Sequence, residues 1–242
     1  GDALTSGYSN TFLGNDSGGT ITTGHSNTFI GQNAATNNNS GTQKTTAIGA
    51  SAGANGDSDE SVFIGFAAAG SGTKTNDTDG TVAIGKSSLS ALTSGAANIA
   101  IGYQSGLETT IGDNNVYIGY RAAYRTANLN NQNNVFIGYY AGSGDWTSTL
   151  SSKNTAVGSL SMEGAMNSAL ENTAVGYRAL NAITTADSNT AIGVDCGDEL
   201  TDGHNNVAIG AATLGTSTSV GFATAVGQQA MGSGDVTAAA DG

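Results

Sequence analysis

The sequence predicts an all-β fold, a parallel β-solenoid of about 13 coils with roughly 16–20 residues each, from three observations. A glycine preceded by an aliphatic residue recurs at a nearly constant interval along the 242-residue chain. Each of these glycines follows a short apolar segment with a β-branched residue, which is typical of a strand. Proline is absent, as expected where backbone N–H groups bond to neighbouring coils. A short, regular repeat of this kind is characteristic of a solenoid.

Thirteen glycines anchor the repeat: Gly14, Gly31, Gly49, Gly65, Gly85, Gly102, Gly119, Gly138, Gly158, Gly176, Gly193, Gly210 and Gly227. Positions are counted from this glycine. Position −1 is Ile, Leu or Val in all copies and position −3 is always β-branched, so each coil is expected to open with a strand of about five residues. A turn, a second shorter extended piece and another turn complete the coil. Residue −1 is interpreted as a core position.

Two other positions indicate a narrow, ordered interior. Position −4 is Asn in nine copies, such as Asn27 and Asn189, and position +3 is always small, as in Ser17, Ala34 and Cys196. Asparagine at a fixed position of stacked coils is expected to form an amide ladder. A small residue at +3 implies that two walls of the coil approach closely.

Position −2 is Ala in eight copies and aromatic in five, and it is never polar. Neighbouring residues of a strand face opposite sides, so residue −2 is interpreted as facing outward and both faces of the strand are apolar. A strand of this kind is covered on both sides. A second and third copy of the chain would cover the outer face, with these candidate residues in the homotrimer interface: Phe12, Phe29, Phe63, Tyr117, Phe136, Ala174, Ala191 and Ala208.

The units NTFIGQNAA, NIAIGYQSG, NTAVGYRAL and NNVAIGAATL resemble the YadA-type head repeats of trimeric autotransporter adhesins and related repeats of phage tail fibres. The resemblance covers residues 10 to about 232. It implies a left-handed parallel β-roll, three chains intertwined or side by side, and a role in attachment. The coils here are longer than the shortest adhesin repeat, so longer turns are expected.

Composition sets further limits. The unbroken repeat favours a single domain over residues 1–242, and both ends fall within a repeat, as expected of a fragment of a longer fibre. The formal net charge is −12 with only seven basic residues, which disfavours nucleic acid as a partner. No apolar stretch approaches the length of a membrane span, so no direct membrane insertion of this segment is expected.

Candidate chemical groups are few. Cys196 is expected to be a small buried residue, and His25 and His204 occupy the same turn ten coils apart, so no metal site is expected from them. The acidic loops at 56–61 and 76–80 lack the ligand pattern of a calcium loop. No catalytic, cofactor-binding or metal-binding residue is therefore assigned, and the protein is not expected to be an enzyme.

Aromatic residues offer a candidate binding surface. Tyr103, Tyr120 and Tyr139 follow the glycine on three successive coils, with Tyr140 and Trp146 nearby. One interpretation is a structural ladder of stacked rings. The other is a stripe that stacks on receptor glycans, with Trp146 in one of the longest coils.

These observations together predict the shaft or head of a trimeric surface attachment fibre, as in a bacterial adhesin or a phage tail fibre. The expected location is extracellular, on a cell surface or a virion, and the expected partners are two further copies and a host-surface glycan or protein receptor. A spacer without ligand is the alternative. An ice-binding solenoid and a glycan-cleaving tailspike are less favoured.

Overall fold

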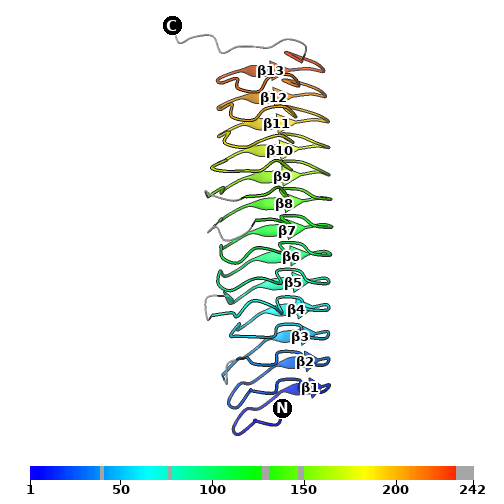
Figure 1. Cartoon of the computed structure of the whole chain (residues 1–242), viewed down its shortest axis with the longest axis vertical. Helices are drawn as coiled ribbons and strands as arrows, with labels where there is room; N and C mark the ends of the chain where they lie inside the picture. Colours follow the sequence, from blue (N-terminus) through cyan, green and yellow to red (C-terminus); the bar gives the residue numbers. More distant parts are fainter. Residues whose placement is uncertain (39–40, 76–77, 127–130, 147–149, 233–242) are drawn as a thin grey trace. The chain divides into compact units, whose positions relative to one another are not determined.

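The computed structural model describes residues 1–38, 41–75, 78–126, 131–146 and 150–232. The chain is all-β and forms a parallel β-solenoid of about 12 turns with a repeat of about 17 residues, which confirms the predicted fold class in outline. It divides into two compact units, Gly1–Ile118 (unit 1) and Gly119–Gly242 (unit 2), which are described separately. Figure 1 shows each coil contributing one strand to its unit.

Every strand has three residues, fewer than expected, because the glycine and a left-handed residue end the extended backbone. Unit 1 contains β1 (Thr11–Leu13), β2 (Thr28–Ile30), β3 (Thr46–Ile48), β4 (Val62–Ile64), β5 (Val82–Ile84), β6 (Ile99–Ile101) and β7 (Val116–Ile118). Unit 2 contains β8 (Val135–Ile137), β9 (Thr155–Val157), β10 (Thr173–Val175), β11 (Thr190–Ile192), β12 (Val207–Ile209) and β13 (Thr224–Val226). Within each unit successive strands pair in parallel and in register, so equivalent positions of the repeat stack.

The anchor glycines are required by the stacking of coils. Gly176 has φ of 141°, and a Cβ atom on it would lie 2.2 Å from the carbonyl oxygen of Gly193 in the next coil. Real Cβ atoms do not approach backbone this closely, and a side chain is strained at this φ. The same close approach recurs at other stacked anchor glycines, such as Gly158 and Gly193, which explains why glycine recurs at this position of the coils.

Three further positions of every coil adopt positive φ, and the sequence analysis did not predict them. Positions −5, +2 and +4 are left-handed in all 13 copies, whichever residue occupies them, as at Glu171 (60°), Arg178 (54°) and Leu180 (48°). Left-handed backbone is unfavourable for residues with a side chain, so bonds between coils must offset the cost. The Arg178 N–H, for example, donates to the Ser159 carbonyl of the coil before, at 3.0 Å. The stretch from −5 to +4 forms a constant block in each coil.

The predicted asparagine ladder is confirmed within each unit. In unit 2 the backbone N–H of Asn172 donates to Oδ1 of Asn154, and the N–H of Asn189 donates to Oδ1 of Asn172, both at 3.0 Å. Asn98 and Asn115 make the same contact in unit 1. These side chains are buried, and the ladder therefore satisfies backbone groups that water cannot reach.

The strand faces are the reverse of those predicted from the sequence. The side chains at position −2 point into the coil: the candidate interface residues Phe29, Phe63, Tyr117, Phe136, Ala174, Ala191 and Ala208 are buried within the single chain, and Phe12 is half-buried. Their assignment to an outward face is wrong. The interior accommodates either Ala or an aromatic ring, as where Phe29 and Phe63 flank Ala47 in the register of β2, β3 and β4.

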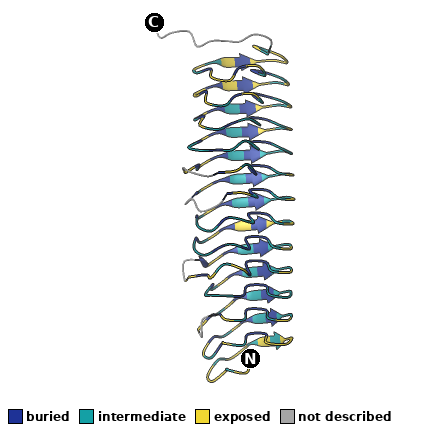
Figure 2. Cartoon of the chain, in the orientation of Figure 1, coloured by how far each residue is buried: buried dark blue, intermediate teal, exposed yellow. Residues whose placement is uncertain are grey.

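Positions −3 and −1 face outward instead, so residue −1 is not a core position. We call the side chains at these two positions the outer seam of each unit. Figure 2 shows the contrast along the strands, with buried central residues and flanking residues that are intermediate or exposed. The exposed seam residues are Thr11, Leu13, Ile99 and Ile101 in unit 1 and Val175, Ile192, Val207, Ile209, Thr224 and Val226 in unit 2.

Candidate functional site

The predicted tyrosines lie on the surface, and those of unit 2 come together. The rings of Tyr120 and Tyr139 stack with centroids 5.5 Å apart and planes within 14°, and both side chains are exposed. Tyr140 meets the Tyr139 ring edge-on at 4.7 Å. In unit 1, Tyr103 is also exposed and lies 5.9 Å from the Lys86 ammonium. The stacked ladder is thus confirmed for Tyr120 and Tyr139.

Trp146 does not belong to this surface. Its side chain is 1% exposed, and its ring packs edge-on against Phe136 in the interior at 5.5 Å. The long coil between Gly138 and Gly158 lets the chain turn this large ring inward, where its apolar area is removed from water. The hypothesis that Trp146 stacks on a glycan is therefore wrong.

A cluster of arginine and tyrosine side chains was missed by the sequence analysis. The Arg121 guanidinium lies over the rings of Tyr124, Tyr120 and Tyr140, with its carbon 4.6, 5.4 and 5.7 Å from their centroids. Its Nη1 also donates to the Tyr140 hydroxyl. Arg125 donates from Nη1 to both carboxylate oxygens of Asp145, at 3.0 and 3.1 Å. The doublet Tyr-Arg at 120–121 and 124–125 was the available signal.

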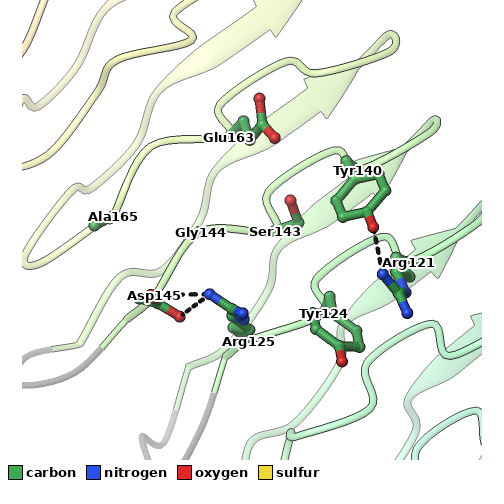
Figure 3. A pocket seen from close by; sticks show the side chains of 9 residues that line it. All are labelled: Arg121, Tyr124, Arg125, Tyr140, Ser143, Gly144, Asp145, Glu163 and Ala165. Carbon is green, nitrogen blue, oxygen red and sulfur yellow. Dashed lines mark hydrogen bonds and ion pairs between the residues drawn. The ribbon is translucent and has the colours of Figure 1, made fainter.

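These side chains surround a hollow of about 340 Å³ that spans three successive coils of unit 2. We call it the Arg-Tyr hollow, and Figure 3 shows its lining residues: Arg121, Tyr124, Arg125, Tyr140, Ser143, Gly144, Asp145, Glu163 and Ala165. Gly144 and Ala165 provide little side-chain volume, which leaves the space open. Glu163 accepts a hydrogen bond from Asn181 Nδ2 at 3.2 Å.

The acidic loop at 56–61 uses its carboxylates between coils. Asp59 accepts bonds from the backbone and side chain of Gln43, and Glu60 pairs with Lys44 at 2.7 Å. Asn76 and Asp77 of the second acidic loop lie outside the described residues. Nowhere in the described ranges do three or more His, Cys, Asp or Glu side chains group in a way that could hold a metal ion.

The two histidines each contact an aromatic ring of their own unit. His25 stacks on Tyr8 at 4.7 Å, and His204 meets Phe222 edge-on at 5.2 Å. Cys196 is buried, its Sγ lies 3.3 Å from the Ala208 carbonyl oxygen, and burial raises the pKa of its thiol to about 11. The interpretation of Cys196 as a small buried residue is confirmed.

Lys74 of unit 1 is a buried lysine that the sequence analysis did not single out. Its side chain is 4% exposed, and Nζ donates to the carbonyl groups of Ala54 and Ala69 and lies 6.0 Å from the Phe63 ring centre. Burial lowers the pKa of Lys74 from 10.5 to about 7. Between these values the unfolded chain binds one more proton than the folded chain, so the stability of unit 1 rises with pH across this window.

We expect the free energy of unfolding of unit 1 to increase from about pH 7 to about pH 9.5 by on the order of 1 kcal/mol per pH unit. Urea unfolding followed by circular dichroism at several pH values measures it. Lys74→Met should remove the increase, because its side chain does not titrate. The control, Lys86→Met at an exposed position, should keep it. An unchanged pH dependence in Lys74→Met would contradict this assignment.

Comparisons with known proteins found no match, so the function of the chain is inferred from its own geometry. In the parts of the chain that the structure describes, no helix has the length and apolarity needed to cross a membrane. No family model matches the chain, and neither a curated protein nor a solved structure matches it. What the chain does is therefore inferred from the seam, the surface tyrosines and the Arg-Tyr hollow.

Proposed function

We propose that this chain is a segment of the shaft or head of a homotrimeric attachment fibre, located on a cell surface or a virion and in contact with a host glycan or protein receptor. The observation that carries the proposal is the outer seam. Each strand presents aliphatic or threonine side chains outward at positions −3 and −1, and several are exposed in the single chain. Contiguous apolar surface of this kind is typical of an interaction site.

A further copy of the same chain is the partner that fits the seam. Parallel, in-register pairing repeats the outward residues at one strand spacing, as where Thr190 and Ile192 align with Val207 and Ile209. Identical copies carry the same spacing and can match it coil for coil. The seam positions contain no charged residue, so copies with a formal net charge of −12 meet there without burying like charges.

The number of copies and the left-handed coil are proposed from the resemblance to adhesin and tail-fibre repeats. In a trimer the seams would face a common axis, and the turns with the surface tyrosines would face outward in three copies. Weak receptor contacts repeated in this way gain strength through avidity. The proposed role is structural and adhesive and contains no catalytic step.

Loss of the seam's apolar character should prevent assembly. We expect sedimentation velocity to give three times the chain mass for the unmodified protein and one chain mass for the double variant Ile192→Lys and Ile209→Lys. Buried lysines without partners cost several kcal/mol, and the seam would hold six of them in a trimer. Circular dichroism should show that the variant keeps its strands, because these side chains point away from the interior.

Val194→Lys is the matched control for that experiment. Val194 lies in the same coil as Ile192 and is similarly exposed, at 49% against 40%, but it follows the anchor glycine and lies outside the seam. The control should remain trimeric. A monomeric unmodified protein at concentrations of tens of micromolar would contradict the proposal, and equal dissociation of both variants would contradict the role of the seam.

A further inference from the structure

We propose that the Arg-Tyr hollow of unit 2 binds a neutral saccharide. The inference rests on the proposed function, because it names the class of receptor that one surface of the fibre would contact. The proposed saccharide site consists of side chains other than those of the outer seam. Assembly and saccharide binding can therefore fail independently of each other.

The size of the hollow fits a small ligand. Its volume of about 340 Å³ lies near the lower end of ligand pockets, which are roughly 300–1,000 Å³. The lining comes from three successive coils, and Figure 3 shows Tyr124, Arg125 and Tyr140 around the space with Glu163 from the third coil. Arg121 and Tyr140 lie in the constant block of their coils, and in the arc that follows, the Trp146 N–H donates to the Arg125 carbonyl oxygen at 3.2 Å. The backbones of the first two coils are therefore held relative to each other before binding.

The charges of the hollow favour a ligand without net charge. Arg121 and Arg125 are balanced by Asp145 and Glu163, and Asp145 already holds Arg125 through both carboxylate oxygens. An anionic ligand would compete with that carboxylate and meet a protein of formal net charge −12. A cationic ligand would compete with Arg121, which already lies over three tyrosine rings.

The polar groups suit a ligand that both donates and accepts hydrogen bonds. A guanidinium offers five N–H donors in a fixed plane, and a carboxylate offers about four lone-pair sites. Arg125 uses only Nη1 in its bonds to Asp145, and both side chains remain more than half exposed. Neighbouring hydroxyl groups of a sugar can accept from the one and donate to the other. The tyrosine rings supply flat apolar surface for the C–H face of a pyranose.

The chain contains its own comparison for this site. The tetrapeptide Gly-Tyr-Arg-Ala occurs at 119–122 and again at 176–179. In the second copy Arg178 is directed to carboxylates, with Asp195 at 3.5 Å and Asp198 at 3.3 Å. Tyr177 is exposed in the same way as Tyr120. Tyr177 and Arg178 thus reproduce the local sequence without the three-ring contact of Arg121.

A glycan array tests the proposal, with defined neutral oligosaccharides printed beside their sialylated forms and fluorescently labelled protein as the probe. We expect the unmodified protein to bind at least one neutral oligosaccharide. The double variant Tyr124→Ala and Arg125→Ala should reduce that binding at least tenfold. The control, Tyr177→Ala and Arg178→Ala, should retain it. Glu163→Gln keeps the shape of its side chain and should weaken binding several-fold, which preserves a test if the double variant does not fold.

Three results would overturn the proposal: no neutral oligosaccharide bound, equal loss in the two double variants, or preference for the sialylated forms. The last would show that the charge argument is incorrect. Sedimentation of the same samples separates the two proposals. A trimer that binds no saccharide would support the fibre and contradict the saccharide site. A monomer that binds a neutral saccharide at this hollow would support the site and contradict the fibre.

Discussion

Replacing Gly176 by alanine is expected to destabilise unit 2 by about 4 kcal/mol or more. The added Cβ would lie 2.2 Å from the carbonyl oxygen and 2.7 Å from the carbonyl carbon of Gly193. Both atoms are backbone, and Gly193 is itself held by its N–H bond to Val175 at 2.9 Å. Strained φ alone costs of order 1–3 kcal/mol, and separating two coils adds the loss of their bonds.

Trp146 gives a signal for this measurement, because it is buried in unit 2 and becomes exposed on unfolding. Guanidinium unfolding followed by its fluorescence should show a much lower midpoint in Gly176→Ala. The matched control is Gly227→Ala. Gly227 has φ of 121°, yet among the described residues nothing lies within 4 Å of the Cβ position, so only the conformational cost applies. Equal losses in both variants would show that crowding is not the reason for the glycine.

Removal of one rung of the asparagine ladder should have the second largest effect, a loss of about 4 kcal/mol for Asn172→Ala. Asn172 Oδ1 accepts from both the N–H and Nδ2 of Asn189, each at 3.0 Å. Its Nδ2 donates to the Ala186 carbonyl at 2.7 Å. Alanine removes the partners of the buried Asn189 N–H and Ala186 carbonyl, and each such group costs about 1–3 kcal/mol. Asn189 Nδ2 keeps its bond to the Gly203 carbonyl oxygen at 2.8 Å.

Hydrogen exchange locates the damage. The Asn189 amide should exchange much faster in Asn172→Ala, because its acceptor is gone. Asn172→Thr should lose less stability, since Thr45 occupies the equivalent position of a coil in unit 1 and keeps a hydroxyl there. Asn167→Ala, at a half-buried position five residues earlier in the chain, should cost less than about 1 kcal/mol. Unchanged protection of the Asn189 amide in Asn172→Ala would contradict the role of the ladder.

Sequence reasoning predicted the stacked coils but not which face of each strand points into the coil. The glycine period, the β-branched residues and the asparagines each impose a local requirement that reappears in every coil, so a pattern alone reveals them. Positions −2 and −1 are both apolar, and alternation shows only that they face opposite sides. The available clue was size: position −2 changes between Ala and Phe, which a shared interior accommodates, whereas the outward residue stays Ile, Leu or Val.

The left-handed residues and the hollow escaped prediction for a different reason. Glycine marks position +4 in only five coils, such as Gly18 and Gly197, and positions −5 and +2 carry residues with side chains throughout the chain apart from Gly80. Stacking imposes the conformation there, not local preference. The Arg-Tyr hollow depends on contacts between residues of neighbouring coils, as between Arg125 and Asp145. Trp146 was misplaced because length alone does not show whether a longer coil turns its ring inward.

Each coil consists of the constant block, which stacks on its neighbours, and a connecting arc, which varies in length. The block from −5 to +4 has the same number of residues in every coil, so all differences in coil length arise in the one arc that joins successive blocks. The Arg-Tyr hollow begins in this arc, at Tyr124, Ser143 and Glu163. Peptides inserted there would lengthen a loop without shifting the register of the strands on either side, which makes the arc the natural place for new recognition surfaces to evolve or to be grafted.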